Sequence, residues 1–583
     1  MTTSQRHPGG PSATAELSRL ADSYWTFLLE RDPLLRSRRG MPVKWLPDVS
    51  VAQTEDRARF ATGILDQVRA LHPTGLSGDD ADTLGYLTEL AERDIGAARF
   101  YWLTPCATPY QLLPLSLYAD TVFRPFVLDG PADAERYASL VHGLARHVGS
   151  LAEKVAGQAA RGCRIPARAL EGVRTTLRGL RASVVAAVVL DEARLVALDR
   201  AHHGRLEDEV SRLVAAELEP AFDQLLGAVD DRAYRGDPPE RVGWAHYDGG
   251  EEAYRFFVRA HTTTDMSPER LHDLGREHCR ELAERMREIR AVMGFTGSET
   301  EFHARLKTEP VLYARTPEEV EARYRHHLNR LEPLLPRWFA ALPRAPYDVA
   351  RLDPALEPRM TFGYYDGPTA VRPVGRYRYN ASDLANRSLL SAANLIYHEL
   401  VPGHHFQLAR QAENASLPDL RRELTGCSGF LEGWAEYAAG LGWEMGLYDD
   451  PWDAYGRLAG ERFTAARMVV DTGLNLGTMN LEQATEYLRA HSMESEARIT
   501  TELLRYATDL PGQALAYRTG YIEFQALRSA AEQREGARFD VRAFHETVLS
   551  GGALPLADLR RRVARHSARR FGAPAPEASG QSS

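Results

Sequence analysis

The chain is poor in cysteine: its 583 residues include only Cys106, Cys163, Cys279 and Cys427. No two of these have the close spacing of a zinc or redox motif, which argues against a cysteine metal site and a disulfide framework. Scattered cysteines are typical of a chain that stays reduced in the cytosol. We therefore expect all four to be structural.

Long apolar runs are also missing. No stretch of about 18 apolar residues predicts a membrane span, and the first ten residues lack the apolar core of a secretory signal. The sequence therefore predicts a cytoplasmic protein with no membrane partner.

The net charge is −9 and the isoelectric point is near 6.1. These values, and the lack of a concentrated basic stripe, argue against a nucleic-acid partner.

The remaining composition, 44% hydrophobic and 26% charged, is that of a soluble globular protein. Apolar residues recur every three or four positions over residues 132–158 and 192–229, which predicts helices. Ser267 followed by Pro268 is typical of a helix start. Only residues 360–380, rich in tyrosine, glycine and proline, indicate a short sheet or hairpin. In many zinc peptidases an edge strand in this position binds the substrate backbone.

We expect a mainly α-helical protein with a small β element and a cleft. Residues 1–13 and 573–583 are polar and rich in Pro, Gly or Ser, so we expect disordered tails. The rest divides into an N-terminal helical half, residues 14–240, and a C-terminal catalytic half, residues 241–572, packed as one body. No internal repeat is visible, and the oligomeric state does not follow from the sequence.

The most informative segment is residues 397–407, in which a His398-Glu399 dipeptide precedes His404 and His405. In an H-E-x-x-H zinc helix, two histidines one turn apart bind the metal and the glutamate acts as base. Here Pro402 stands where the second histidine belongs. In a regular helix His404 would lie roughly 120° from the face of His398, and His405 about 10 Å along the axis. Because proline and glycine disturb a helix, we predict a bulge at Pro402-Gly403 that brings His404 beside His398.

A third ligand is predicted from residues 429–437. Glu432 lies in this segment, downstream of His404, and a glutamate on a second helix completes a His2Glu site in many zinc peptidases. Glu436, one turn further, is expected on the same helix face, where it could orient a ligand.

At these residues the chain resembles the bacterial domain-of-unknown-function 885 family, which is similar to gluzincin metallopeptidases. The family motif H-E-x-x-P-G-H-x-x-Q corresponds to residues 398–407, and E-G-W-A-x-Y to residues 432–437. Weaker similarity extends over roughly residues 20–570, including segments 259–268, 511–517 and 544–556. The chain departs from the pattern at Asn475, where the family has histidine, and at Ala439, where glutamate is expected.

The resemblance implies a zincin-like fold with one Zn2+ held by His398, His404 and Glu432. The expected reaction is hydrolysis of a peptide or amide bond in a short peptide or peptide-like metabolite. Water on the zinc would attack, with Glu399 as general base. Tyr517 is the predicted donor to the oxyanion, as in similar gluzincins. His405 is an alternative donor or ligand.

Three arginines, Arg372, Arg505 and Arg518, are candidates to bind a substrate carboxylate, which would favour carboxypeptidase-like over internal cleavage.

Two alternatives to a general peptide hydrolase stay open. The first is a non-hydrolytic zincin-fold protein that binds a peptide or partner, which Asn475 and Ala439 slightly favour. The second is a dedicated amide hydrolase in a biosynthetic pathway. Mn, Co or Fe could also occupy a His2Glu site.

Overall fold

The computed structural model describes residues 12–71, 76–195, 200–230, 238–354, 357, 363–369 and 372–571. The predicted tails lie outside this part of the chain, except for Ser12, which caps the first helix, and Ala13, which begins it. Ser12 accepts a hydrogen bond from the backbone N–H of Ala15 and so caps α1, Ala13–Arg31. No helix among the described residues is both long and apolar enough to cross a membrane.

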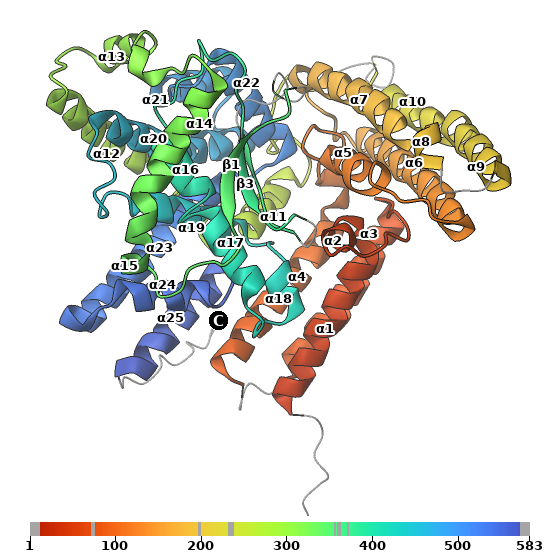
Figure 1. The fold of residues 1–583 in the computed structure, drawn as a ribbon, viewed down its shortest axis with the longest axis horizontal. Helices are drawn as coiled ribbons and strands as arrows, with labels where there is room; N and C mark the ends of the chain where they lie inside the picture. Colours follow the sequence, from red (N-terminus) through yellow and green to blue (C-terminus); the bar gives the residue numbers. More distant parts are fainter. Residues whose placement is uncertain are drawn as a thin grey trace, which may run out of the picture.

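Most of the described chain is helical, as predicted (Figure 1). The helices before residue 240 are α1, α2 (Pro33–Arg38), α3 (Val51–Ala70), α4 (Gly78–Arg99), α5 (Leu113–Tyr118), α6 (Pro131–Ala160), α7 (Ala167–Val188), α8 (Glu192–Leu195), α9 (Arg200–Leu213) and α10 (Glu219–Ala228). Before the sheet and the motifs come α11 (Gly250–Thr262), α12 (Pro268–Val292), α13 (Glu299–Leu306), α14 (Pro317–Leu331) and α15 (Leu335–Trp338).

The motif-bearing region contains α16 (Ala392–Glu399), α17 (His404–Glu413), α18 (Asp419–Glu423), α19 (Ser428–Gly440) and α20 (Pro451–Asn475). It is followed by α21 (Leu481–His491), α22 (Glu496–Leu504), the π-helical turn η7 (Arg505–Asp509), α23 (Leu515–Glu535), α24 (Val541–Leu549) and α25 (Leu556–Phe571). The predicted start of α12 is confirmed, because Ser267 Oγ accepts from the N–H of Arg270 at 3.2 Å and Pro268 is the first helical residue.

A three-stranded sheet lies near the centre of the molecule (Figure 1). Its strand order is β1 (Tyr347–Arg351), β3 (Gly375–Tyr379), β2 (Tyr364–Asp366). Strand β1 runs parallel to β3, with Tyr347 opposite Gly375, and β2 runs antiparallel to it. The expected β element is therefore confirmed for β2 and β3, whereas β1 was not expected. Residues 360–362, 370 and 371 of the predicted segment lie outside the described residues.

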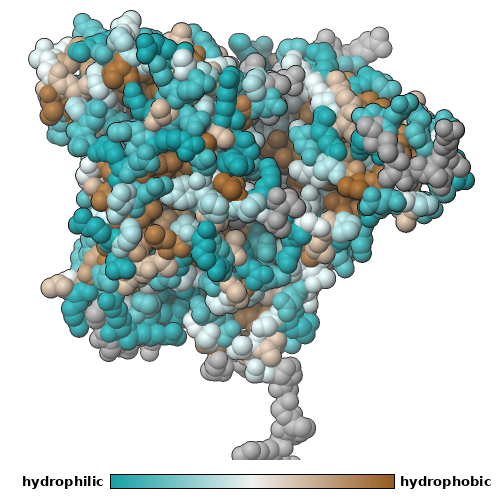
Figure 2. Space-filling view, in the orientation of Figure 1, coloured by the Kyte–Doolittle hydropathy of each residue, from teal (hydrophilic) through white to brown (hydrophobic). Residues whose placement is uncertain are grey.

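The cores do not follow a division at about residue 240. Buried side chains of α1, α3 and α4 share one core with α14, the sheet and α16–α19, and with α23–α25. Helices α5–α10 have a core of their own, and they form the lobe at the right of Figure 1. A third core unites α12 with α20–α22. On the face in Figure 2, hydrophobic residues are interspersed among hydrophilic ones.

Candidate metal centre

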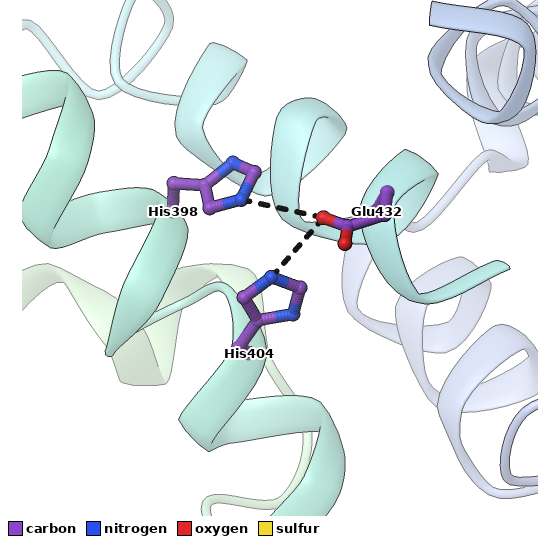
Figure 3. Close-up of side chains that lie close together, drawn as sticks. All are labelled: His398, His404 and Glu432. Atoms are coloured by element: carbon purple, nitrogen blue, oxygen red, sulfur yellow. Dashed lines mark ion pairs between the residues drawn. The ribbon is translucent and has the colours of Figure 1, made fainter. Parts of the chain in front are cut away.

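Three side chains that could hold one metal ion converge from three helices. His398 lies near the end of α16, His404 begins α17, and Glu432 lies on α19. Glu432 Oε2 is 3.6 Å from His398 Nε2 and 3.3 Å from His404 Nε2 (Figure 3). Ligand atoms of all three lie within 4.8 Å of one another. The structure thus brings together the three residues that the sequence predicts as metal ligands.

The two histidines come together in a different way from the one predicted. We expected a bulge within one continuous helix, and this is wrong: α16 ends at Glu399 and a new helix begins at His404. The Val401–Pro402 peptide between them is cis. Phe406 N–H donates to Leu400 O at 3.2 Å, so the chain folds back across the break. Pro402 has no N–H with which to continue the first helix.

Two features fix the path of the chain at this break: the close approach of Gly403 to α16 and a hydrogen bond from α19. A Cβ on Gly403 would stand only 1.8 Å from the carbonyl oxygen of His398, so only glycine allows the chain to pass this close to the last turn of α16. The indole N–H of Trp434, on α19, donates to Pro402 O at 3.0 Å. Because Glu432 lies on the same helix as Trp434, this bond also ties the third candidate ligand, the Glu432 carboxylate, to the two histidines.

The donor set fits a divalent metal ion. Glu432 Oε2 is buried and has no hydrogen-bond partner among the described residues, although it faces both imidazole Nε2 atoms. A buried polar atom without a partner is costly, and a cation shared by the three groups would satisfy it. Two imidazoles and one carboxylate are a set that zinc prefers. The His404 and Glu432 side chains are 14% and 18% exposed, so solvent reaches the site.

Without a metal, the histidines and carboxylates stabilise one another's charges. Burial alone would lower the pKa of His398, but the nearby carboxylates of Glu432 and Glu436 outweigh burial and raise the pKa to about 10. Burial would raise the pKa of Glu432, but the nearby imidazoles of His398 and His404 lower it overall. A metal ion would replace the proton on His398, since only a neutral imidazole coordinates.

A buried ionic network fixes the orientation of His398. Glu436 Oε1 is 3.1 Å from His398 Nδ1, which leaves Nε2 directed toward Glu432. Arg457, fully buried on α20, donates to Glu436 Oε2 at 3.1 Å and to Glu461 Oε1 at 2.9 Å. Arg518 Nη1 extends the network by donating to Glu461 Oε2 at 3.1 Å. Burial would raise the pKa of Glu436, but Arg457 and His398 lower it to about 2, so this carboxylate is a permanent anion beside the imidazole.

Glu399, the predicted base, ends α16 directly beside His398. Burial raises the pKa of its carboxyl, while the nearby His398 and His404 lower it in part. After burial itself, the Glu399 charge helps to raise the pKa of Tyr365 and of Tyr377, on β2 and β3. The carboxylate is therefore near enough to both the histidines and these tyrosines to influence their charges. A raised pKa suits a group that must take up and release a proton near neutrality.

Tyr517 and His405 occupy different environments. The Tyr517 ring, on α23, lies almost parallel to that of His398, with centroids 6.3 Å apart, so its hydroxyl belongs to the neighbourhood of the ligands. His405 is fully buried. Its Nδ1 is 2.9 Å from the Tyr365 hydroxyl and its Nε2 is 3.0 Å from Ala345 O. Burial lowers its pKa to about 4. Since both ring nitrogens are engaged away from Glu432, the structure gives no support to His405 as a ligand or oxyanion donor.

The three predicted substrate arginines are not brought together. Arg372 is exposed and pairs with Asp366 on β2 at 2.9 Å. Arg518 is buried in the network behind Glu436. Arg505, on η7, pairs with Glu502 at 2.8 Å and is a neighbour of Tyr517. A substrate role remains a prediction for all three, and the position of Arg505 fits it best.

The two departures from the family pattern are both buried. Asn475 Nδ2 donates to Asp471 O at 2.9 Å and to Tyr506 O at 3.1 Å. Ala439 O accepts from the Tyr448 hydroxyl at 2.9 Å. Neither belongs to the group of possible metal ligands.

Sequence reasoning missed three residues that shape the site: Trp434, Arg457 and Arg467. Trp434 was visible as part of the E-G-W-A-x-Y motif, but its role depends on where residue 402 lies. Arg457 and Glu461 are four residues apart on one helix, a spacing that indicates an ion pair but not that the pair is buried behind a ligand. No sequence signal distinguishes Arg467, described below, from other helical arginines.

Comparison with known proteins identifies relatives without an assigned activity. No curated protein matches the sequence. A crystal structure of a candidate lipoprotein from Colwellia psychrerythraea is 23% identical, with a TM-score of 0.84, and covers 96% of this chain and 100% of its own. A candidate lipoprotein of unknown function from Shewanella oneidensis is 18% identical, with a TM-score of 0.69, over 94% of this chain and 99% of its own. Both show the same fold.

The family match is broader than the motifs. Residues 33–563 match the family described as bacterial protein of unknown function, DUF885. This range includes the three convergent residues, Glu399, and the whole network behind His398. The chain belongs to the DUF885 family.

Proposed function

We propose that this protein is a zinc-dependent hydrolase that cleaves a peptide or amide bond in short peptides or peptide-like metabolites. One observation carries the proposal: His398, His404 and Glu432 converge from separate helices, with an oriented imidazole and with Glu399 directly beside them. A purely structural metal site has no need of an additional carboxylate with a raised pKa.

His398, His404 and Glu432 would hold the metal, and three protein ligands leave a position open, as in catalytic zinc sites. Bound zinc would supply Lewis acidity and make water a stronger acid. The Glu436–Arg457 network would keep His398 in the required orientation. This arrangement supports a gluzincin-like relationship, which we include in the proposal together with the cleft that such an enzyme requires.

The chain's own groups would move the protons. Glu399 would accept a proton from the attacking water and return it to the nitrogen of the leaving amine. The Tyr517 hydroxyl would donate a hydrogen bond to the oxygen that becomes negative as water adds to the carbonyl. Burial raises the pKa of Tyr517, so the hydroxyl stays protonated and able to donate.

The test is hydrolysis of a peptide library by zinc-loaded protein, with products identified by mass spectrometry. Glu399→Gln, which keeps the size of the side chain but cannot act as base, is the matched control. Cleavage by the wild type but not by this variant supports the proposal. Cleavage by neither, with zinc bound, would favour the non-hydrolytic binding protein.

We retain a cytoplasmic location as part of the proposal. The two similar structures are those of candidate lipoproteins, so the location needs its own test. Fractionation of cells that express the full chain should find it in the soluble cytoplasmic fraction. Recovery with membranes would contradict this part of the proposal.

A further inference from the structure

A cluster of arginines with largely buried side chains lies near Tyr517. We define it as Arg467 on α20, Arg498 on α22 and Arg505 on η7. The Arg467 guanidinium carbon is 5.0 Å from the centre of the Tyr517 ring, and that ring is 6.3 Å from the ring of His398. Arg467 therefore contacts the same aromatic ring that lies against a predicted metal ligand.

In the part of the chain that the structure describes, the arginine cluster contains more guanidinium groups than the carboxylates that form ion pairs with it. Glu502 accepts from Arg467 Nη2 at 3.2 Å and from Arg505 Nη2 at 2.8 Å, and so serves two guanidinium groups. Glu494 pairs with Arg498 at 3.0 Å. Among the described residues, these three guanidinium groups thus share two carboxylates in ion pairs.

Two further carboxylates lie near Arg505 but are already satisfied. Asp471 accepts from the Tyr254 hydroxyl at 2.7 Å and from Gly512 N–H at 3.1 Å. Asp509 accepts from the Thr108 hydroxyl and from Tyr110 N–H. Neither makes an ion pair with a member of the arginine cluster in the described part of the chain.

Arg467 is buried and has unused hydrogen-bonding capacity. Its residue is only 8% exposed, yet within the described residues its single hydrogen bond is the one from Nη2 to Glu502. Among the same residues, the buried Nε has no partner, and neither has Nη1. A buried donor such as Nε without a partner is costly, and the planar fork of a guanidinium matches a carboxylate.

We propose that Arg467, supported by Arg505, binds the free C-terminal carboxylate of the substrate and makes this protein a carboxypeptidase-type hydrolase. An extended chain spans about 3.3–3.6 Å per residue, so the path from the guanidinium past Tyr517 to His398 holds at most roughly three residues after the cleaved bond. The exposed Tyr110 ring, 5.4 Å from the Arg505 guanidinium, lies where the arginine cluster reaches solvent.

This inference rests on the proposed function for its account of cleavage, but its binding step can be tested separately. The probe is a library of three- to six-residue peptides, each prepared with a free C-terminal carboxylate and as the C-terminal amide. Affinity is measured on zinc-treated Glu399→Gln protein to avoid turnover, and cleavage is measured on the wild type. Circular dichroism and metal content verify that each variant is folded.

Free acids should bind about 10- to 100-fold more tightly than their amides, as expected for charge-assisted hydrogen bonds. Arg467→Met should abolish this preference and leave affinity for the amides unchanged. Arg467→Lys keeps the positive charge but not the planar guanidinium, so it should retain part of the preference for free acids. It provides a second variant if Arg467→Met does not fold. Arg489→Met, which removes an exposed arginine paired with Glu496, is the matched control and should keep the full preference.

Equal affinity for acids and amides, binding of neither, or an acid preference that survives Arg467→Met would overturn the inference. So would a preference for acidic side chains that is independent of the C-terminus. Acid preference in binding with no cleavage would refute only the proposed hydrolysis, whereas cleavage with no acid preference would refute only the role of Arg467.

Discussion

Replacing Gly403 by alanine should separate the two histidines without removing any ligand. The added Cβ would stand 1.8 Å from His398 O, 2.5 Å from His398 C and 2.6 Å from Tyr397 O. All three are backbone atoms of the last turn of α16, so no side chain can rotate away. Since Cβ contacts below 3.0 Å are essentially never seen, α16 and the loop must move apart until the 1.8 Å contact has opened to at least that distance.

A displacement of this size is large for a metal site, where ligand distances hold to about ±0.2 Å. A misplacement of about 1 Å typically costs on the order of 100-fold in a positioned site. We therefore expect zinc affinity to fall about 100-fold, which corresponds to about 2.7 kcal/mol. The added strain of about 1–3 kcal/mol is below a typical domain stability of about 5–15 kcal/mol, so the variant should fold.

The assay is competition for zinc against a chelating indicator, with thermal unfolding of the metal-free protein measured in parallel. Gly149→Ala, on α6, is the matched control because no atom lies within 4 Å of its added Cβ, and it should bind zinc as the wild type does. A folded Gly403→Ala protein with wild-type zinc affinity would refute the claim that this close approach positions His404.

Three further predictions concern the ligands and their support. Glu399→Gln should keep its zinc and lose hydrolysis, as zinc analysis and product detection will show; surviving turnover would mean that another group is the base. His404→Ala should lose zinc whereas His405→Ala should not, because His405 bonds to Tyr365 and Ala345 instead; the reverse result would make His405 the ligand. Glu436→Gln should weaken zinc binding about 10- to 100-fold in the indicator assay, and an unchanged affinity would remove this carboxylate from the account.

The sequence was sufficient for the helical character of the fold and for the three residues that converge. Both depend on local patterns. The helices follow from apolar periodicity, and the candidate ligands follow from the two short motifs at residues 398–407 and 432–437. It was not sufficient for the path of the chain at Pro402. Pro402 and Gly403 predict a disturbance, but the Trp434 contact that fixes the break comes from a helix 32 residues away.

Long-range packing explains the other differences. The first helices share a core with the last ones, and Arg562 bonds to Asp79, 483 residues earlier. No local pattern reports such contacts, so a boundary at about residue 240 was the natural expectation. Strand β1 exists because it pairs with β3, which comes after β2 in the chain. Arg518 and Arg467 both lie on helices near the site, and only the packing shows that one faces Glu461 and the other Tyr517.

Metal content tests the central claim most directly. Elemental analysis should find about one zinc per chain in the wild type and none in His398→Ala or Glu432→Ala. The control variant His326→Ala, which removes an exposed histidine outside the candidate ligand set, should keep its zinc. A folded wild-type protein that contains no metal and cannot be loaded with zinc would contradict the account.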